Sequence, residues 1–275
     1  MAHRPIVTLT TDFGTNDHFV GAVKGVILDI VPEAAIVDIS HAVQAFDVLD
    51  GALTISQTYS YFPTGTVHMI VVDPGVGTAR RPIIASSDGY HFVAPDNGVL
   101  SMIYAKEERI HVRHVTAEHY FHQPVSNTFH GRDIFAPVAA YLAKMVDSHK
   151  FGDEIEDYVR FAAPKPKPAG ENRIRAVVLK VDRFGNLISN VTPDDVPALF
   201  AGKAAFKIVV GNREITELRG NYAEGAPGEV FGILGSMGYL EIVANRAAAA
   251  QITGAGKGSE VSIILGEAVA AGKGA

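Results

Sequence analysis

The sequence has no cysteine among its 275 residues, which excludes disulfides, thiolate nucleophiles and zinc or iron–sulfur centres held by cysteine. It also lacks any apolar run approaching the roughly 20 residues of a membrane span. The N-terminus runs straight into a strand pattern, so we expect neither a signal peptide nor a membrane anchor. Lys and Arg are not clustered and the formal net charge is −6, which argues against a nucleic-acid partner. We therefore expect a cytoplasmic protein that binds a small molecule.

The residues that are present, 47% hydrophobic and 20% charged, are typical of a globular protein. In the first part of the chain, strand-like Ile6–Thr10 and Ala35–Ile39 flank apolar residues at helical spacing, which is a βαβ pattern. Prolines alternate with lysines around residues 164–170, and short strands with turn signals follow. We predict an α/β protein in three parts: an N-terminal, mostly parallel, Rossmann-like three-layer sheet domain over residues 1–163, a linker over 164–170, and a smaller C-terminal β-barrel or sandwich domain over 171–275.

The most informative stretch is a nearly unbroken apolar run, Val67–Val72, that ends in Asp73 and a glycine-rich turn. Such a run is typical of a strand that is covered on both faces. Pro74 removes a backbone donor, and Gly75 and Gly77 permit backbone angles that other residues resist, so strand pairing should stop here. In open α/β sheets, ligands bind at this carboxyl edge of the strands.

Other polar residues fall at predicted loop positions of the first domain, and they can converge if the sheet is doubly wound. They are Asp12 and Asp17 after the first strand, Arg80 in the turn after Asp73, and His130 before a long helical pattern. Each also has a purely structural explanation, since an aspartate can cap a helix, an arginine can be solvated and a histidine can begin a helix. No dinucleotide, phosphate-loop or serine-hydrolase motif accompanies them.

Two loops of the second domain carry a complementary set of groups. Asp182–Asn186 interrupts two predicted strands and suits an ordinary hairpin, and Gly235–Glu241 is similar. Together these loops supply an aromatic ring, an amide, a hydroxyl and a carboxylate. Such a set can stack on and hydrogen-bond a heterocycle or an amino acid.

Five motifs, in order along the chain, resemble one known family: Thr11–Gly14, Val72–Thr78, Phe129–Asp133, Asp182–Asn186 and Gly238–Glu241. They are similar to motifs of the S-adenosyl-L-methionine hydroxide adenosyltransferases, which are relatives of the fluorinase and chlorinase. The resemblance implies cleavage of S-adenosyl-L-methionine by water or hydroxide, giving adenosine and L-methionine, with no metal and no redox cofactor. It also implies a homotrimer in which the first domain of one subunit meets the second domain of its neighbour at each site.

The resemblance further implies roles for particular residues. The catalytic residues would be Asp73, Arg80 and His130, with Arg81 as the competing arginine. Asp12 would hold the ribose hydroxyls. The other substrate-binding residues would be Asp17, Asp182 and Ser236 for the methionine portion, Phe184 and Asn186 for adenine, Phe46 and Tyr222 as further candidates, and Glu241.

The chain departs from the halogenating relatives at two positions. Gly131 stands where their halide pocket has a serine, and Met237 stands where the fluorinase has an arginine for the substrate carboxylate. Two other functions are compatible with the residues. One is a non-catalytic protein that binds S-adenosyl-L-methionine or a nucleoside. The other is a metal-dependent phosphatase or nucleotidase, because hard cations accept ligands such as Asp12, Asp17, Asp73 and His130.

Overall fold

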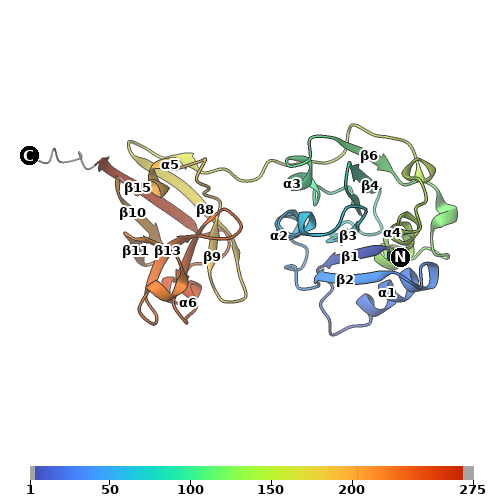
Figure 1. Ribbon diagram of the computed structural model, residues 1–275, viewed down its shortest axis with the longest axis horizontal. Coiled ribbons are helices and arrows are strands. Elements are labelled where there is room, and N and C mark those ends of the chain that lie inside the picture. Colours follow the sequence, from blue (N-terminus) through green and yellow to red (C-terminus); the bar gives the residue numbers. More distant parts are fainter. Residues whose placement is uncertain (1–3, 203, 269–275) are drawn as a thin grey trace, which may run out of the picture. The chain divides into compact units, whose positions relative to one another are not determined.

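The computed structural model describes residues 4–202 and 204–268. The chain divides into two compact units, Met1–Ala163 and Pro164–Ala275 (Figure 1). Each unit has an apolar core of its own.

Within the described residues, the first unit is built on a six-stranded sheet. Its strands are β1 (Ile6–Thr11), β2 (Ala35–Ser40), β3 (Val67–Val71), β4 (Pro82–Ser87), β5 (His91–Pro95) and β6 (Ile110–His114). Their order across the sheet is β2-β1-β3-β5-β4-β6. β1 pairs in parallel with β2 and β3, and β3 pairs in parallel with β5, whereas β4 is antiparallel to both of its neighbours.

Helices connect these strands. The α-helices are α1 (Phe19–Ile30), α2 (Val48–Ser56), α3 (Ser101–Tyr104) and α4 (Ala136–Ala143). A π-helical turn, η3 (Gly131–Phe135), leads directly into α4, and short 3₁₀ turns lie at η1 (Tyr59–Tyr61), η2 (Glu118–Tyr120) and η4 (Ser148–Phe151). The Asp47 carboxylate caps α2 by accepting a hydrogen bond from Asp50 N at 3.1 Å, as the sequence of this segment favours.

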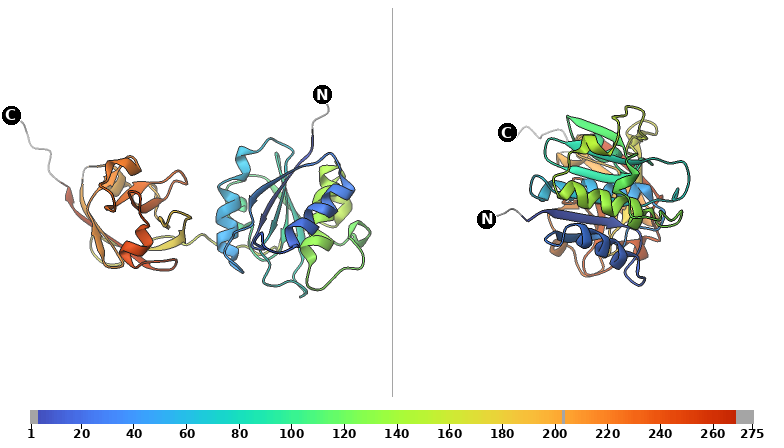
Figure 2. Two further views of the ribbon diagram at one scale, coloured as in Figure 1. Left: turned by 90° about the horizontal axis from the view of Figure 1, so that it is seen from below. Right: turned by 90° about the vertical axis from the view of Figure 1, so that its right-hand side faces the viewer.

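The helices cover both faces of the sheet, with α1 and α4 on one side and α2 on the other (Figure 2, left). The packing of β3 explains why its sequence is almost entirely apolar. Met69 and Val71 pack in the core under α1 and α4, while Ile70 packs in the core that contains Ile55 of α2 and Ile103 of α3. Because successive residues of a strand point to opposite faces, a strand covered on both faces needs an unbroken apolar run.

The second unit consists mainly of strands. They are β7 (Lys167–Pro168), β8 (Arg173–Val181), β9 (Leu187–Ser189), β10 (Ala204–Val210), β11 (Arg213–Ile215), β12 (Leu218–Arg219), β13 (Val230–Leu234), β14 (Leu240–Ala244) and β15 (Glu260–Ala268). Short helical segments lie at α5 (Pro197–Phe200), η5 (Tyr222–Glu224) and α6 (Ala249–Thr253).

One long strand holds the second unit together. The first half of β8 pairs with β15, and its second half, from Val178, pairs with β9. The path of paired strands therefore runs β11-β10-β15-β8-β9-β14-β13-β12 in one curled sheet, with β7 added on β8. Ile208, Ile242 and Ile263 are fully buried in the core that this curled sheet surrounds. The prediction of an α/β protein with a parallel-containing sheet and a second, β-rich part is confirmed at this level.

Among the helices that the structure describes, none combines the length and the apolar character needed to cross a membrane.

A fully buried histidine lies in the middle of the first sheet. His68 on β3 has its Nδ1 2.7 Å from Thr8 Oγ1, and its ring stacks on Phe92 at 5.2 Å between centroids. Tyr59 and Phe62 contact the same ring edge-on. Burial in this aromatic surrounding lowers the pKa of His68 to about 3, because a protonated ring would lose its hydration.

His68 should therefore make folding sensitive to acid. Its pKa is lower in the folded state than in the unfolded state, so the stability it provides is complete above about pH 6.5. It falls by about 1.4 kcal/mol per pH unit as the pH drops from there toward 3. Urea unfolding at pH 6.5 and pH 5 should show a loss about 2 kcal/mol larger for the wild type than for His68→Gln. His122→Gln, at an exposed side chain, is the control and should behave as the wild type. Equal pH dependence in all three proteins would contradict this account.

Candidate active site

The turn after β3 folds an arginine back onto an aspartate. Asp73 follows the buried Val72, and successive tight turns place Val76 N on Asp73 O and Thr78 N on Gly75 O, each at 3.2 Å. The Thr78 hydroxyl also donates to Gly75 O at 2.7 Å. Because pairing in the sheet ends before Pro74, the chain is free to make this reversal.

Asp73, Arg80 and His130 form one contiguous cluster. Arg80 Nε donates to Asp73 Oδ1 at 2.9 Å, and Arg80 Nη2 donates both to Asp73 Oδ2 and to His130 Nδ1, the latter at 2.8 Å. The side chains of Asp73 and Arg80 are 5% and 9% exposed, so this bidentate ion pair is largely desolvated. Among the described residues, Arg80 Nη1 is buried without a hydrogen-bond partner.

Burial and the contact with Arg80 together determine the protonation of His130. Burial and the neighbouring Arg80 guanidinium lower the pKa of His130 below its ordinary value, so the ring is neutral near pH 7. A guanidinium can only donate hydrogen bonds, so Nδ1 must be the acceptor and the proton of the neutral ring lies on Nε2. His130 therefore offers a donor, not a basic nitrogen, at its other end.

A cavity of about 280 Å³ opens beside this cluster. Asp12, Asp73 and His130 line it together with apolar side chains that include Phe13, Phe19, Phe46, Val71, Val76 and Phe129. Three predicted loop positions thus meet at one cavity, and two of them, Asp12 and Asp73, follow strands at the carboxyl edge of the sheet. This edge is where ligands bind in open α/β sheets.

Asp12 lines the cavity and also holds the backbone of Phe46. Its Oδ2 accepts a hydrogen bond from Phe46 N at 2.9 Å, which holds Phe46 in a left-handed conformation with φ of 65°. Burial raises the pKa of Asp12 above its ordinary value, although the Phe46 N–H opposes this. The Phe46 ring is 74% exposed.

Two other candidates lie away from the cluster. Asp17 is exposed and does not line the cavity. Arg81 points elsewhere: its Nε and Nη2 donate to Asp96 Oδ2 at 2.9 and 2.7 Å, and its Nη1 donates to Asp157 Oδ1 at 2.8 Å. Of the two adjacent arginines, it is therefore Arg80 that contacts Asp73.

The segment that leads to His130 is held from two sides. Asp133 is completely buried, and its carboxylate accepts from Ser126 N at 2.8 Å and from Arg132 Nε at 2.6 Å. On the other side Gly77, with φ of 77°, packs directly on Asn127, and a Cβ at Gly77 would overlap the Asn127 carbonyl oxygen. This close approach joins the turn that carries Arg80 to the segment that carries His130.

The second unit has a cavity of its own, of about 560 Å³. Phe184, Asn186 and Tyr222 line it together with Asn245 and Arg246. The loop of Phe184 and Asn186 is organised by one carboxylate, because Asp182 Oδ1 accepts from the backbone N–H groups of both residues and Oδ2 accepts from Asn186 Nδ2 at 2.9 Å. The Phe184 ring is 77% exposed.

Glu241 is buried and shares a hydrogen bond with Tyr222, which lines this cavity. Burial, followed by the nearby Asp182 carboxylate, raises the pKa of Glu241, whereas a hydrogen bond to the Tyr222 hydroxyl opposes the rise. Ser236 is exposed on the turn between β13 and β14 and lines neither of the two cavities.

Several residues that line the two cavities are not among the candidates predicted from the sequence. Phe13 and Phe129 lie inside motifs that were noticed for their polar members, so an aromatic residue beside each polar one was the available signal. Asn245 and Arg246 follow a strand without any pattern that marks them. Across residues 4–202 and 204–268, no group of three or more His, Asp or Glu side chains is placed to hold a metal ion.

The chain matches known families and proteins along most of its length. Residues 7–152 match the family described as SAM hydroxide adenosyltransferase N-terminal domain, and residues 176–262 match the corresponding C-terminal domain. A protein of Methanocaldococcus jannaschii named (R)-S-adenosyl-L-methionine hydrolase is 37% identical over 74% of this chain and 73% of its own length. A protein of the same name from Salinispora tropica is 35% identical over 97% of this chain and 100% of its own length.

The chain is also similar to a fluorinase and to a protein of solved structure. A fluorinase of an Actinoplanes species is 30% identical over 70% of this chain and 73% of its own length. Among solved structures, an uncharacterized conserved protein from Thermotoga maritima superposes with a TM-score of 0.86 and is 34% identical, covering 94% of this chain and 99% of that one.

Gly77 should be much less tolerant of substitution than Gly65, another glycine with a left-handed backbone. Gly65 has φ of 88° with no atom within 4 Å of an added Cβ, so Gly65→Ala should cost only about 1 kcal/mol of backbone strain. Gly77→Ala adds an overlap with Asn127 and should cost roughly 2 kcal/mol more. Guanidinium unfolding of the two variants measures the difference. Equal losses would show that the turn and the 126–130 segment are not packed as described.

Proposed function

Because the chain belongs to the SAM hydroxide adenosyltransferase family, we propose that it cleaves S-adenosyl-L-methionine with water, giving adenosine and L-methionine. The observation that carries this proposal is the buried Asp73–Arg80–His130 cluster at the wall of a cavity. The reaction forms a C5′–O bond and breaks the C5′–S bond. The electron pair of the broken bond goes to sulfur, which leaves as a neutral thioether and needs no acid.

The side chains of the cluster suit the handling of one water molecule. Asp73 is the group able to accept a proton or a strong hydrogen bond from the attacking water. His130, with its proton on Nε2, donates to the water oxygen and orients it. Arg80 donates to both side chains, so it fixes the orientation of the Asp73 carboxylate and holds His130 in this tautomer. In this arrangement the proton released by the water passes to Asp73 and then to solvent.

The same cluster favours hydrolysis over halogenation. A fluorinase is among the relatives, and in such an enzyme the nucleophile is an anion. Asp73 puts a carboxylate in the wall of the cavity, which repels a halide but accepts a hydrogen bond from water. We therefore assign water, not halide, as the nucleophile.

The remaining residues are proposed to bind the substrate, with no metal or redox cofactor taking part. Asp12 holds the ribose hydroxyls from the wall of the first cavity, where Phe46 also lies. Phe184, Asn186 and Tyr222 contact the adenine from the second cavity. The methionine portion is assigned to Asp17, Asp182, Ser236 and Glu241.

The direct test is incubation with S-adenosyl-L-methionine in oxygen-18-labelled water. Adenosine carrying the label at its 5′ oxygen is the expected product, and unlabelled or absent adenosine would reject the function. The relatives carry the (R) designation in their names, so the (R) and (S) sulfonium forms should be assayed separately. We expect the (R) form to be cleaved faster. Intact substrate after prolonged incubation would indicate a binding protein instead.

Substitutions should separate residues that act on water from those that bind the nucleoside. Asp73→Asn and His130→Ala should each lower kcat by at least about 100-fold, with smaller changes in KM. Asp12→Ala should instead raise KM by about tenfold, because a carboxylate on the ribose hydroxyls acts equally in the ground and transition states. Steady-state kinetics of adenosine release measures both. The reverse pattern would mean that the two roles are exchanged.

The assembly is proposed to be a homotrimer with its sites between subunits. The candidate residues are divided between two units that have separate cavities, and each cavity exposes an aromatic ring, Phe46 in one and Phe184 in the other. A head-to-tail contact between the first unit of one chain and the second unit of the next closes into a ring and completes one site per contact. The proline-rich linker limits how far one chain can fold onto itself.

Complementation tests this assembly. Asp73→Asn and Asn186→Ala inactivate different halves of the site, so a mixed ring contains some contacts in which both halves are intact. Mixing the two variants under conditions of demonstrated subunit exchange should restore roughly a quarter of the wild-type activity. A monomer by light scattering, or no recovery after exchange, would show that each site is built within one chain.

A further inference from the structure

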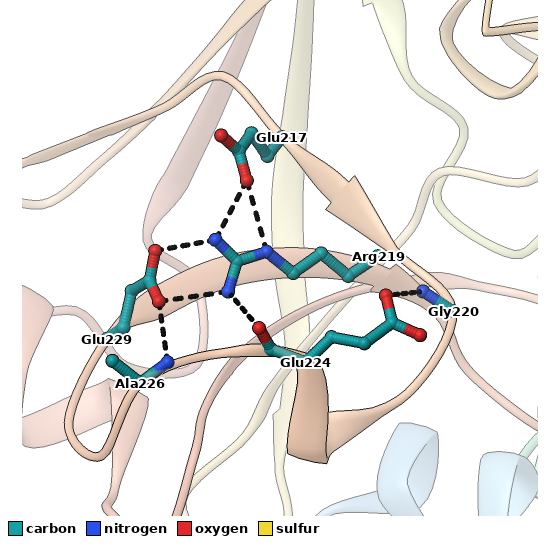
Figure 3. Close-up of polar contacts among 6 residues, drawn as sticks. All are labelled: Glu217, Arg219, Gly220, Glu224, Ala226 and Glu229. Atoms are coloured by element: carbon teal, nitrogen blue, oxygen red, sulfur yellow. Dashed lines mark hydrogen bonds and ion pairs between the residues drawn. The ribbon is translucent and has the colours of Figure 1, made fainter.

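One arginine in the second unit uses all of its hydrogen-bond donors on a single segment of chain (Figure 3). Arg219 on β12 donates from Nε and Nη2 to Glu217 Oε2 at 3.1 and 2.8 Å. It donates from Nη2 and Nη1 to the two carboxylate oxygens of Glu229 at 2.6 and 2.9 Å, and from Nη1 to Glu224 O at 2.9 Å. A guanidinium has five N–H groups, and all five are occupied here.

The same contacts close the segment between β12 and β13 into a compact loop. Glu229 Oε2 also accepts from Ala226 N at 2.7 Å, and Glu224 Oε2 accepts from Gly220 N at 3.1 Å (Figure 3). The face of the Arg219 guanidinium lies 4.8 Å from the centroid of the Phe231 ring. The Arg219 side chain is only 16% exposed, whereas the Glu217 side chain is 63% exposed. Arg219 is therefore the interior member of this network.

This loop forms part of the wall of the second cavity. Tyr222, at the start of η5, lines the cavity. Asn245 also lines this cavity. Its Nδ2 donates to Gly225 O at 2.7 Å, and its backbone carbonyl accepts from Gly228 N at 2.8 Å. Hydrogen bonds therefore join the loop both to Arg219 and to Asn245, which lines the cavity as Tyr222 does.

We propose that Arg219 is a positioning residue for substrate binding: it folds the 217–229 loop so that Tyr222 is presented to the cavity beside Phe184 and Asn186. Arg219 itself does not line that cavity. Its effect on the substrate passes through Tyr222, and in this respect the inference rests on the proposed function. A lysine cannot replace it, because one ammonium group has three donors and cannot span two carboxylates and a carbonyl at once.

Since the chain has no tryptophan, Tyr222→Trp places a single fluorescent reporter on the loop. Adding Arg219→Lys in this background should shift the emission to the red and raise the acrylamide quenching constant by about twofold, since the loop loses the fork that closes it. This readout needs no activity. Unchanged emission and quenching would overturn the proposal.

Kinetics test the connection to the substrate. Arg219→Lys should raise KM for S-adenosyl-L-methionine by about fivefold while kcat stays within about twofold, since binding and not chemistry is affected. In the Tyr222→Ala background the same substitution should change KM by less than about 1.5-fold, because residues that act through one another are not additive. Equal effects in both backgrounds would mean that Arg219 acts on stability in general, and would overturn the proposal.

Two further variants distinguish a specific effect on the loop from misfolding of the protein. Glu217→Gln removes charge from an exposed partner while leaving Glu229 in place, and should raise KM about twofold in a protein that folds normally. Glu214→Gln is the matched control, because Glu214 pairs with Lys207 at 3.0 Å on β10 and β11 and should leave KM and the reporter unchanged.

The two proposals can fail separately. If the wild type does not hydrolyse S-adenosyl-L-methionine, the proposed function is wrong. The reporter shift and the affinity for adenosine, measured by equilibrium dialysis, still decide the role of Arg219. Normal adenosine affinity in Arg219→Lys would overturn that role.

Discussion

The contact on which the first unit's site depends is the buried fork of Arg80, which joins the Asp73 carboxylate to the His130 ring. Removing these charges from water is costly, and only close pairing with good geometry offsets that cost. The turn after β3 must therefore reverse so that Arg80 reaches Asp73, and the segment before α4 must approach it. Together with burial, the same contact lowers the pKa of His130 and keeps its ring neutral, and it determines which ring nitrogen carries the proton.

Other contacts hold the segment that carries His130 close to the turn that carries Arg80. Gly77 packs on the Asn127 backbone, and the buried Asp133 accepts from Ser126 N, so that the 126–130 segment is held between two fixed points. Arg132 completes this arrangement, since it neutralises Asp133 and lies over the Phe129 ring, which lines the cavity. None of these residues is assigned to the reaction, yet each restricts where His130 can lie.

Carboxylates that hold loops recur throughout the molecule. Asp12 holds Phe46 N, Asp96 holds Val159 N, Asp182 holds two backbone N–H groups of its own loop, and Glu229 holds Ala226 N. Charge-assisted bonds to backbone N–H groups are short and strong, and they satisfy donors that the sheet leaves unpaired. The acidic composition of the chain is thus used partly to shape loops, and both cavities are lined by loops shaped in this way.

By itself the sequence determined the α/β character of the first unit, the β-rich second unit and several of the loops that line the two cavities, because burial periodicity and turn residues are local properties. It favoured Arg80 over Arg81 only through the spacing of one motif, since neighbouring residues in a loop have no periodicity to separate them. Only the tertiary structure decided between them, by placing Asp96 and Asp157 against Arg81 and His130 against Arg80. Arg219 and Asn245 were likewise undetectable, because their partners are set by how loops from separate strands meet, which no local pattern encodes.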